Sequence, residues 1–205
     1  MATVTSYGAA KVVTGSCHLL AIEHGPRILI DCGMFQGRET DRNYDAFHFD
    51  AFEIDYLLVT HAHLDHVGRI PKLVKEGFGG AIYATAASRD IAEIILLDSA
   101  KIMKEDFQTN FKKAQRRGKE KDVREPLYDE DDVEATFDLP WHHPEYDESF
   151  ELKEGVKVTY HNAGHILGAA FIEITYQEHG VEQTIVFSGD IGNDNDMVME
   201  NLGKC

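Results

Sequence analysis

Short apolar runs separated by tight turns open the chain and predict a group of strands. Residues 3–8, 18–23 and 27–32 (TVTSYG, HLLAIE and RILIDC) alternate between apolar and polar positions or run apolar, and a Gly-Pro pair separates the last two. Residues 54–60 (IDYLLVT) have a continuous apolar centre, which is typical of a strand buried on both faces. We therefore expect several strands joined by short loops.

The middle of the chain changes to helical periodicity. Pro71 fits the first turn of a helix over PKLVKEGF, where its missing N–H is harmless, and AIYAT at residues 81–85 predicts a short strand. From residue 88 to residue 117 the pattern is helical, and an apolar stripe on this helix predicts core packing. Residues 127–150 are predicted to be an irregular acidic connector with one short helix at DEDDVEATF and a loop at WHHPEY. The stripe consists of Ile91, Ile95, Met103, Phe107 and Phe111.

The remaining sequence returns to strand patterning. VKVTYHN, AAFIEITYQ and EQTIVFSGD are separated by the glycine-bearing turns NAGHILG and EHG. Strands, then helices, then strands again predict a sheet covered by helices in the α/β (α+β) class, with a helical and acidic insertion at about residues 86–150. At 205 residues, one domain with one substantial core is the default expectation.

Composition and charge narrow the class of protein only a little. The apolar fraction of 43% is ordinary for a folded protein, and the lack of a long apolar window or a secretory leader predicts a cytoplasmic protein with no membrane partner. Three cysteines without a CxxC pair argue against a disulfide framework, and we expect Cys17 and Cys32 to be core residues. The net charge of -16 comes mostly from residues 120–154, whereas residues 111–121 (FKKAQRRGKEK) are basic. We interpret both stretches as solvated faces, so whole-chain charge decides little about partners.

A histidine-rich motif follows the apolar strand at residues 54–60. In the extended HAHLDH segment, His61 and His63 are two positions apart and can present their imidazoles to one ion. Asp65 and His66 come where the chain turns, so the spacing suits two neighbouring ions better than one. Imidazole and carboxylate ligands suit zinc, with iron or manganese as alternatives. A polar surface turn is the other interpretation, but this pattern is rare at the end of an apolar strand.

Further segments supply candidate ligands for such an ion. His165 lies in AGHILGAA, where Gly164 and Gly168 allow sharp backbone turns. Asp190 lies in FSGDIG at the end of an apolar run, where a charge is costly unless it has a partner, and a metal ion is the natural one. Asp31 in ILIDCG shows the same pattern, although its carboxylate could equally accept hydrogen bonds from loop N–H groups.

The order and spacing of these residues resemble the first four motifs of the metallo-β-lactamase superfamily. The segments VTGSCHLL, DCGMFQG, AGHILGAA and VFSGDIG resemble the β-CASP branch of RNA- and DNA-processing nucleases. Within that branch they look most like the prokaryotic ribonucleases related to the endonuclease of pre-mRNA 3′-end cleavage, which carry a similar helical insertion. The resemblance covers essentially the whole chain and implies a four-layer αββα sandwich.

The resemblance also implies roles for individual residues. It implies two zinc ions, with one carboxylate bridging them and another supporting the ligands and the bridging water. A hydroxide activated by two such ions attacks phosphorus, which implies hydrolysis of phosphodiester bonds in RNA, or alternatively DNA, during RNA processing or decay. The implied ligands are His61, His63 and His165 for one zinc, Asp65 and His66 for the second and Asp190 for both, and the implied catalytic carboxylates are Asp31, Asp65 and Asp190.

The resemblance further implies that the chain is the N-terminal part of a longer nuclease, either an excised fragment or a truncated gene product. In β-CASP nucleases a second domain follows the fourth motif, clamps the nucleic acid and supplies a histidine thought to protonate the leaving oxygen. The chain then returns with one more metal-binding histidine. We therefore expect an incomplete sandwich, a second zinc site that lacks one ligand, weak or no activity of this chain alone, and self-association through uncovered sheet surface.

Other functions stay open at this point. A small-molecule thioester hydrolase of the glyoxalase II type shares the THxHxDH core and the same water activation. A non-catalytic metal-binding subunit is the second alternative, although such relatives typically lose ligands and all the positions present here are intact. The motifs do not separate endonuclease from 5′ exonuclease action. The remaining histidines, including His18, His142, His143 and His161, are interpreted as surface or hydrogen-bonded core residues.

Overall fold

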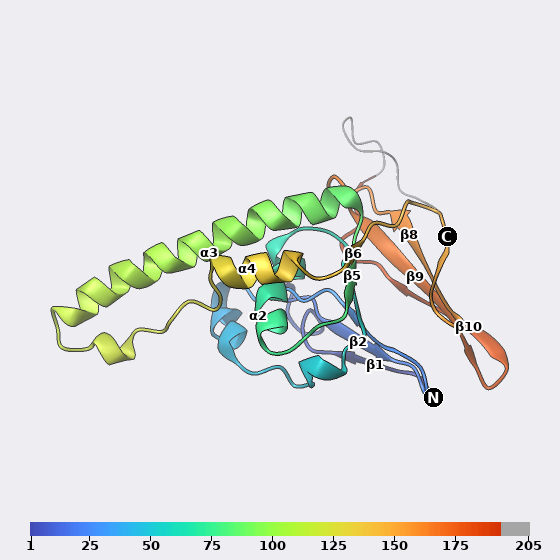
Figure 1. The fold of residues 1–205 in the computed structure, drawn as a ribbon, viewed down its shortest axis with the longest axis horizontal. Coiled ribbons are helices and arrows are strands. Elements are labelled where there is room, and N and C mark those ends of the chain that lie inside the picture. Colours follow the sequence, from blue (N-terminus) through green and yellow to red (C-terminus); the bar gives the residue numbers. More distant parts are fainter. Residues whose placement is uncertain (194–205) are drawn as a thin grey trace.

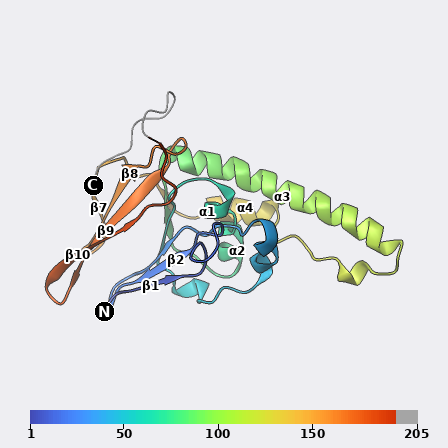
Figure 2. The same cartoon turned by 180° about the vertical axis from the view of Figure 1, so that it is seen from behind.

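The computed structural model describes residues 1–193, which form three layers: helices, a six-stranded sheet and a four-stranded sheet (Figure 1, Figure 2). The six-stranded sheet has its strands in sequence order, β1 (Thr3–Ser6), β2 (His18–Ala21), β3 (Arg27–Ile30), β4 (Tyr56–Leu58), β5 (Ala81–Tyr83) and β6 (Trp141–His142). The four-stranded sheet has the order β10 (Val181–Phe187), β9 (Ala170–Glu178), β8 (Val156–Asn162) and β7 (Phe150–Lys153). The helices are α1 (Leu64–Val67), α2 (Ile70–Lys75), α3 (Ala86–Gln115) and α4 (Glu130–Phe137), with 3-10 helices η1 (Gly37–Tyr44), η2 (Ala51–Glu53) and η3 (Glu120–Asp122).

β4 lies inside the six-stranded sheet and is buried on both faces, as its apolar centre predicts. Leu57 packs into the core between this sheet and the helices, whereas Leu58 packs into the core between the two sheets. Strands β1 to β3 are antiparallel and β3 to β6 are parallel, so β3 and β4 end at the same edge. Asp31 and His61 leave the sheet at this edge.

The two sheets pack face to face through an apolar core. Val158 of β8 lies opposite Ile174 of β9, and Tyr160 lies opposite Ile172, with all four side chains fully buried. They meet apolar side chains of β2, β3 and β4 across the interface. Fully burying one such aliphatic side chain contributes about 1.5–3 kcal/mol, so this core fixes the orientation of the second sheet and of its loops.

α3 begins at the N-cap residue Thr85, whose side chain accepts a hydrogen bond from the N–H of Ser88 at 3.2 Å. The helix runs for 30 residues, which corresponds to about 45 Å at a rise of 1.5 Å per residue. Its far half extends beyond the sheets in both views (Figure 1, Figure 2). Before it, α2 carries Pro71 in its first turn, as predicted.

The apolar stripe predicted along α3 is wrong in part. Ile91 and Met103 pack against the core on the helix side of the sheet. Phe107 and Phe111 lie on the extending half, where they are only half-buried and pack against each other with ring centroids 5.6 Å apart. Periodicity identifies the apolar face of a helix but not the position at which the helix extends beyond the packed layers. The buried positions of α3 are Ser88, Ala92, Leu96 and Ala100.

The connector at residues 127–150 is more regular than predicted. Trp141–His142, expected in a loop, form β6 because they pair in parallel with β5, with Ile82 opposite Trp141. Phe150–Lys153 form the edge strand β7 against β8. Both strands are too short for sequence alternation to reveal them. The short helix predicted at DEDDVEATF is α4.

Three expectations from the sequence concern the layers of the sandwich, membrane-spanning helices and the burial of the cysteines. Residues 1–193 show three of the four predicted αββα layers, since no described helix covers the outer face of the four-stranded sheet. Within the same residues, no helix is long and apolar enough to cross a membrane. Cys17 and Cys32 are fully buried free thiols, as predicted, whereas Cys205 lies outside the described residues.

Candidate metal centre

The loop after β3 holds the HAHLDH turn (residues 61–66) at the sheet edge. The N–H of Cys32 donates a hydrogen bond to the carbonyl of His66 at 2.8 Å. Gly33 lies so close to the turn that a Cβ at this position would overlap the carbonyl of Asp65. These backbone contacts fix the direction of α1 and of the side chains that precede it.

The β8–β9 loop brings His165 to the same edge. Gly164 and Gly168 have positive φ angles of 61° and 81°, in agreement with their predicted role in sharp turns. The hydroxyls of Thr85 and Ser88, at the start of α3, both donate to the carbonyl of Gly168, at 2.7 and 2.8 Å. The loop that carries His165 is therefore attached to the N-terminal end of α3.

Four side chains place their donor atoms around one point. His63 Nδ1 lies 3.1 Å from His61 Nε2 and 3.2 Å from His165 Nε2. Asp190 Oδ2 lies 3.9 Å from His61 Nε2 and 3.6 Å from His165 Nε2, and the four residues have donor atoms within 4.8 Å of one another. A tetrahedral zinc ion with bonds of about 2.0–2.1 Å separates its ligand atoms by about 3.3 Å. Three imidazoles and one carboxylate in this arrangement fit such an ion.

Asp190 faces a second group with its other oxygen. Its Oδ1 lies 3.5 Å from His66 Nε2, while His66 Nδ1 donates a hydrogen bond to Asp31 Oδ2 at 2.7 Å. The ring of His66 is thereby oriented with Nε2 toward Asp190. Asp65 is half-buried in the same turn; its carbonyl accepts a hydrogen bond from the N–H of Ser16 at 2.9 Å, but its carboxylate makes none within the described residues and stands outside the four-residue cluster. The structure therefore gathers four of the other five predicted ligands around Asp190 and leaves Asp65 beside them.

Asp31 is almost fully buried, and its carboxylate accepts several hydrogen bonds. Thr60 donates from its N–H at 2.8 Å and from its hydroxyl at 2.9 Å, and the Ser16 hydroxyl donates at 3.1 Å. Its φ of 58° lies in the left-handed region, which is costly for a residue other than glycine. Burial opposes its ionisation, but the charge and hydrogen bond of His66 outweigh burial and lower the pKa of Asp31. Its contacts are those of a residue that orients a ligand.

The histidines of the centre differ in protonation. Burial, followed by repulsion from His66, lowers the pKa of His61 to about 3. Burial, followed by repulsion from His165, also lowers the pKa of His63. Burial acts in the same direction on His66, but the Asp31 carboxylate, by charge and hydrogen bond, outweighs it and raises the pKa of His66 to about 8. A metal binds neutral imidazole, so His61 and His63 are ready to act as ligands at neutral pH, whereas His66 first loses a proton.

The environment of Asp190 differs from the one predicted. Its side chain is 47% exposed, and β10, which was expected to be a buried run, is exposed along most of its length because it pairs only with β9 in the described residues. The cost of a buried charge therefore applies to Asp31 and not to Asp190. Close contact between Gly189 and Thr60 sets the position of Asp190, since a Cβ at Gly189 would crowd the Thr60 side chain.

A cavity of about 530 Å³ opens beside the centre. Its lining includes Ser16, His18 and Thr60, none of which was predicted to lie at the centre. Thr60 Oγ1 lies 3.1 Å from His61 Nδ1 and 3.3 Å from His66 Nδ1, so it contacts both sides of the centre. Its position directly before HAHLDH was a usable signal, whereas His18 reaches the cavity only because β2 pairs with β3.

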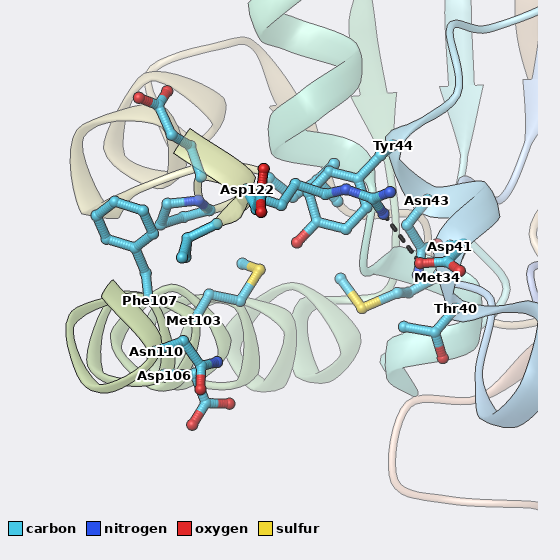
Figure 3. A pocket seen from close by; sticks show the side chains of 15 residues that line it. Met34, Thr40, Asp41, Asn43, Tyr44, Met103, Asp106, Phe107, Asn110 and Asp122 are labelled. Atoms are coloured by element: carbon cyan, nitrogen blue, oxygen red, sulfur yellow. Dashed lines mark hydrogen bonds and ion pairs between the residues drawn. The ribbon is translucent and has the colours of Figure 1, made fainter. Parts of the chain in front are cut away.

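A larger cavity, of about 650 Å³, lies between α3, η1 and residues 122–127 (Figure 3). Met34 and Met103 give it an apolar wall, and Arg124 forms an ion pair with Asp41 at 3.0 Å. None of the predicted metal ligands lines it. The candidate ligands Asp31, His66 and Asp190 instead line the smaller cavity, of about 530 Å³.

The layered fold and the histidine–aspartate cluster together define a protein with a candidate metal site at the edge of its sheets. The family description "Metallo-beta-lactamase superfamily" matches residues 10–203. The chain belongs to this superfamily, as its motifs predict. Among solved structures it is similar to the metallo-beta-lactamase fold protein YhfI from Bacillus subtilis, with a TM-score of 0.53 and 17% identity over 94% of this chain and 63% of that one. At this identity the similarity shows the fold alone.

The chain is also similar to β-CASP RNA-processing nucleases over most of its length, which confirms the predicted resemblance. It is 42% identical to Ribonuclease TTHA0252 of Thermus thermophilus over 93% of this chain and 38% of the relative. It is 34% identical to the transcription termination factor FttA of Methanosarcina mazei over 91% of this chain and 27% of the relative. For Endoribonuclease ysh1 of Schizosaccharomyces pombe the identity is 30%, over 92% and 22%. The chain thus spans well under half the length of these relatives.

Proposed function

We propose that this chain carries the metal centre of a zinc-dependent ribonuclease that hydrolyses phosphodiester bonds in RNA, in cytoplasmic RNA processing or decay. The observation that carries the proposal is the convergence of four donor residues within 4.8 Å, with the second oxygen of Asp190 turned toward His66. Membership of the superfamily supports a hydrolytic metal site, and the names of the relatives support RNA as the substrate.

The proposed ligands divide into two groups that share Asp190. His61, His63 and His165 would hold one zinc ion, and His66 with Asp65 would hold the second. When bound, a zinc pair supplies a nucleophilic water at neutral pH and neutralises charge on the phosphoryl oxygens. A carboxylate with one oxygen toward each group can serve both ions, which the distances from Asp190 to His61 and to His66 allow.

The surrounding residues of the chain prepare this centre. Asp31 holds His66 by its Nδ1 and leaves Nε2 free to face Asp190. Thr60 fixes Asp31 through its N–H and hydroxyl, and its own position at the end of β4 comes from the sheet. Such supporting contacts keep ligands in a reactive geometry, so we assign Asp31 and Thr60 positioning roles in the reaction.

The alternatives from the sequence are less well supported. A thioester hydrolase of the glyoxalase II type would use the same ligands, but the relatives named above are described as a ribonuclease, a termination factor and an endoribonuclease. A non-catalytic subunit has no need of intact ligands, and the donor atoms of the first group are assembled here. Endonucleolytic action on RNA is therefore our first proposal, with 5′ exonuclease action and DNA as secondary outcomes of the assay.

Metal stoichiometry and cleavage assays test the proposal. After zinc reconstitution, native mass spectrometry should find at least one zinc per chain, reduced in His165→Ala and unchanged in the control His143→Ala, whose Nδ1 lies 3.2 Å from the Ala84 carbonyl, away from the centre. The zinc-loaded chain should cleave single-stranded RNA slowly, His165→Ala should not, and neither should hydrolyse a thioester. Absence of zinc after reconstitution, or thioester hydrolysis without RNA cleavage, would contradict the proposal.

A further inference from the structure

The far end of α3 carries a concentrated positive charge. Residues 112–121, which we call the arm tip, contain six of the 20 Lys and Arg residues of the chain and one acidic residue. The other residues together hold 14 basic and 35 acidic side chains. In both views this end of the helix and the turn after it lie beyond the two sheets (Figure 1, Figure 2). The basic residues of the arm tip are Lys112, Lys113, Arg116, Arg117, Lys119 and Lys121.

Lys112, Lys113 and Arg116 lie on one side of the helix end, since Lys112 and Lys113 belong to the last turn of α3 and Arg116 is its C-cap in helical geometry. Arg117 follows in the turn that ends the helix, where its N–H donates to the Ala114 carbonyl at 2.8 Å. Phe107 and Phe111 lie on the opposite side, where their rings pack together. The arm tip therefore presents rows of cations at a spacing of about one helical turn, which suits a chain of phosphates better than a single small anion.

The arm-tip cations are exposed and lack ion pairs among the described residues, whereas Lys104 and Arg124 on either side of them have ion pairs. All six are exposed, and within residues 1–193 no ion pair includes any of them. Lys104, two turns earlier on α3, binds Glu130 at 2.7 Å, and Arg124, just after the arm tip, binds Asp41 at 3.0 Å. The lack of such ion pairs among the described residues leaves the charge of the arm tip available to a partner.

The arm tip is connected to the metal centre by a continuous helix. At the start of α3, Thr85 and Ser88 bond to the loop that carries His165. On the return path Arg124 lies over the ring of Tyr44 at 4.4 Å, and both residues line the cavity of about 650 Å³. The segment that carries the arm tip is thus attached to the rest of the structure at both ends, by residues 85–88 and by Arg124. The length of α3 places its basic end about 45 Å from its start near the centre.

We propose that the arm tip is a second contact for RNA, which binds the phosphate backbone of a strand extending away from the metal centre. The proposal rests on the proposed function, since the same RNA would be the substrate. Cations that displace condensed counterions from phosphates contribute affinity that falls with salt, without reading base sequence. The arm tip would therefore favour long RNA over short RNA and would be indifferent to base composition.

Binding of metal-free protein to a long oligouridine, measured by fluorescence anisotropy over a range of KCl concentrations, tests the proposal without cleavage. The variant is Lys112→Gln/Lys113→Gln, and the matched control is Lys153→Gln/Lys157→Gln, two exposed lysines on the four-stranded sheet with the same change of charge. The loss of two phosphate contacts should reduce the magnitude of the slope of log K against log salt concentration by about 1.4. It should also reduce affinity about 25-fold at about 0.1 M salt. The control should retain wild-type affinity and slope, and circular dichroism should show equal helicity in all three proteins.

Each outcome decides the proposal. Loss of affinity and slope in the arm-tip variant alone supports it. Equal loss of affinity in both variants would show that overall charge is responsible and would overturn the proposal. No loss in either variant, or no binding of RNA by the wild type, would also overturn it. So would a salt-dependent dimer that disappears in the arm-tip variant while RNA binding persists. A trinucleotide is too short to extend from the metal centre to the arm tip, so its cleavage by the zinc-loaded protein does not involve the arm tip. Its failure would therefore count against the metal centre and leave the binding result standing.

Discussion

Replacing Asp31 by Asn should remove the charge that keeps His66 protonated. The Asp31 carboxylate accepts the hydrogen bond of His66 Nδ1 at 2.7 Å, and both side chains are nearly buried. In Asp31→Asn the amide oxygen can still accept hydrogen bonds from Thr60, so the backbone around the site keeps its partners. Burial then acts on His66 without its main counter-charge, and its pKa should fall from about 8 toward its ordinary value of 6.5.

The expected size of the effect follows from proton linkage in the metal-free protein. A pKa of about 8 in the folded state against 6.5 in the unfolded chain corresponds to about 2 kcal/mol of unfolding free energy. Because the folded value is raised, this stabilisation is complete below pH 6.5 and is lost as the pH rises through about 8. His61 and His63 have lowered pKa values and act on stability below that range. Wild type should lose about 2 kcal/mol across this window, and Asp31→Asn should lose little.

Urea unfolding of the metal-free proteins below pH 6.5 and above about 8 measures the change in unfolding free energy, and NMR titration of the His66 ring measures its pKa. Asp147→Asn is the matched control, because it removes another histidine–carboxylate pair, His161 Nδ1 to Asp147 Oδ1 at 2.6 Å, and leaves Asp31 in place. The control should keep the wild-type pH dependence of stability between pH 6.5 and about 8. A His66 pKa that stays near 8 in Asp31→Asn would refute the reasoning.

Two further predictions concern packing. Gly33→Ala should destabilise the protein and weaken zinc binding, because its Cβ would overlap the Asp65 carbonyl, whereas Gly79→Ala has open space around its Cβ and should leave melting temperature and zinc stoichiometry unchanged. Equal effects of the two changes would exclude the backbone contact as the cause. Leu58→Ala should cost about 2–5 kcal/mol in urea unfolding, since this fully buried side chain joins the two sheets. A loss below about 1 kcal/mol would show that the core closes around the gap.

The residues of the candidate metal centre could be predicted from the sequence because local signals mark them. An apolar strand that ends in HAHLDH, glycines on either side of His165 and an aspartate after β3 are all visible without a structure. Their convergence, however, was implied by family resemblance and not by spacing. The positions of Thr60 and His18 beside the candidate centre depend on strand pairing between β2, β3 and β4, which adjacent sequence does not record.

The sequence by itself determined most element types, the buried character of β4 and the family. Periods of two and 3.6 residues, with turn residues between them, express local backbone preferences. Only the tertiary structure decided that Phe107 and Phe111 lie beyond the core, that two residues at 141–142 complete a sheet, and that Asp190 is exposed. It also decided that Asp31 binds His66, which sets the pKa of that histidine. These features arise from contacts between residues far apart in the chain, whose distances and burial are fixed only when the layers pack.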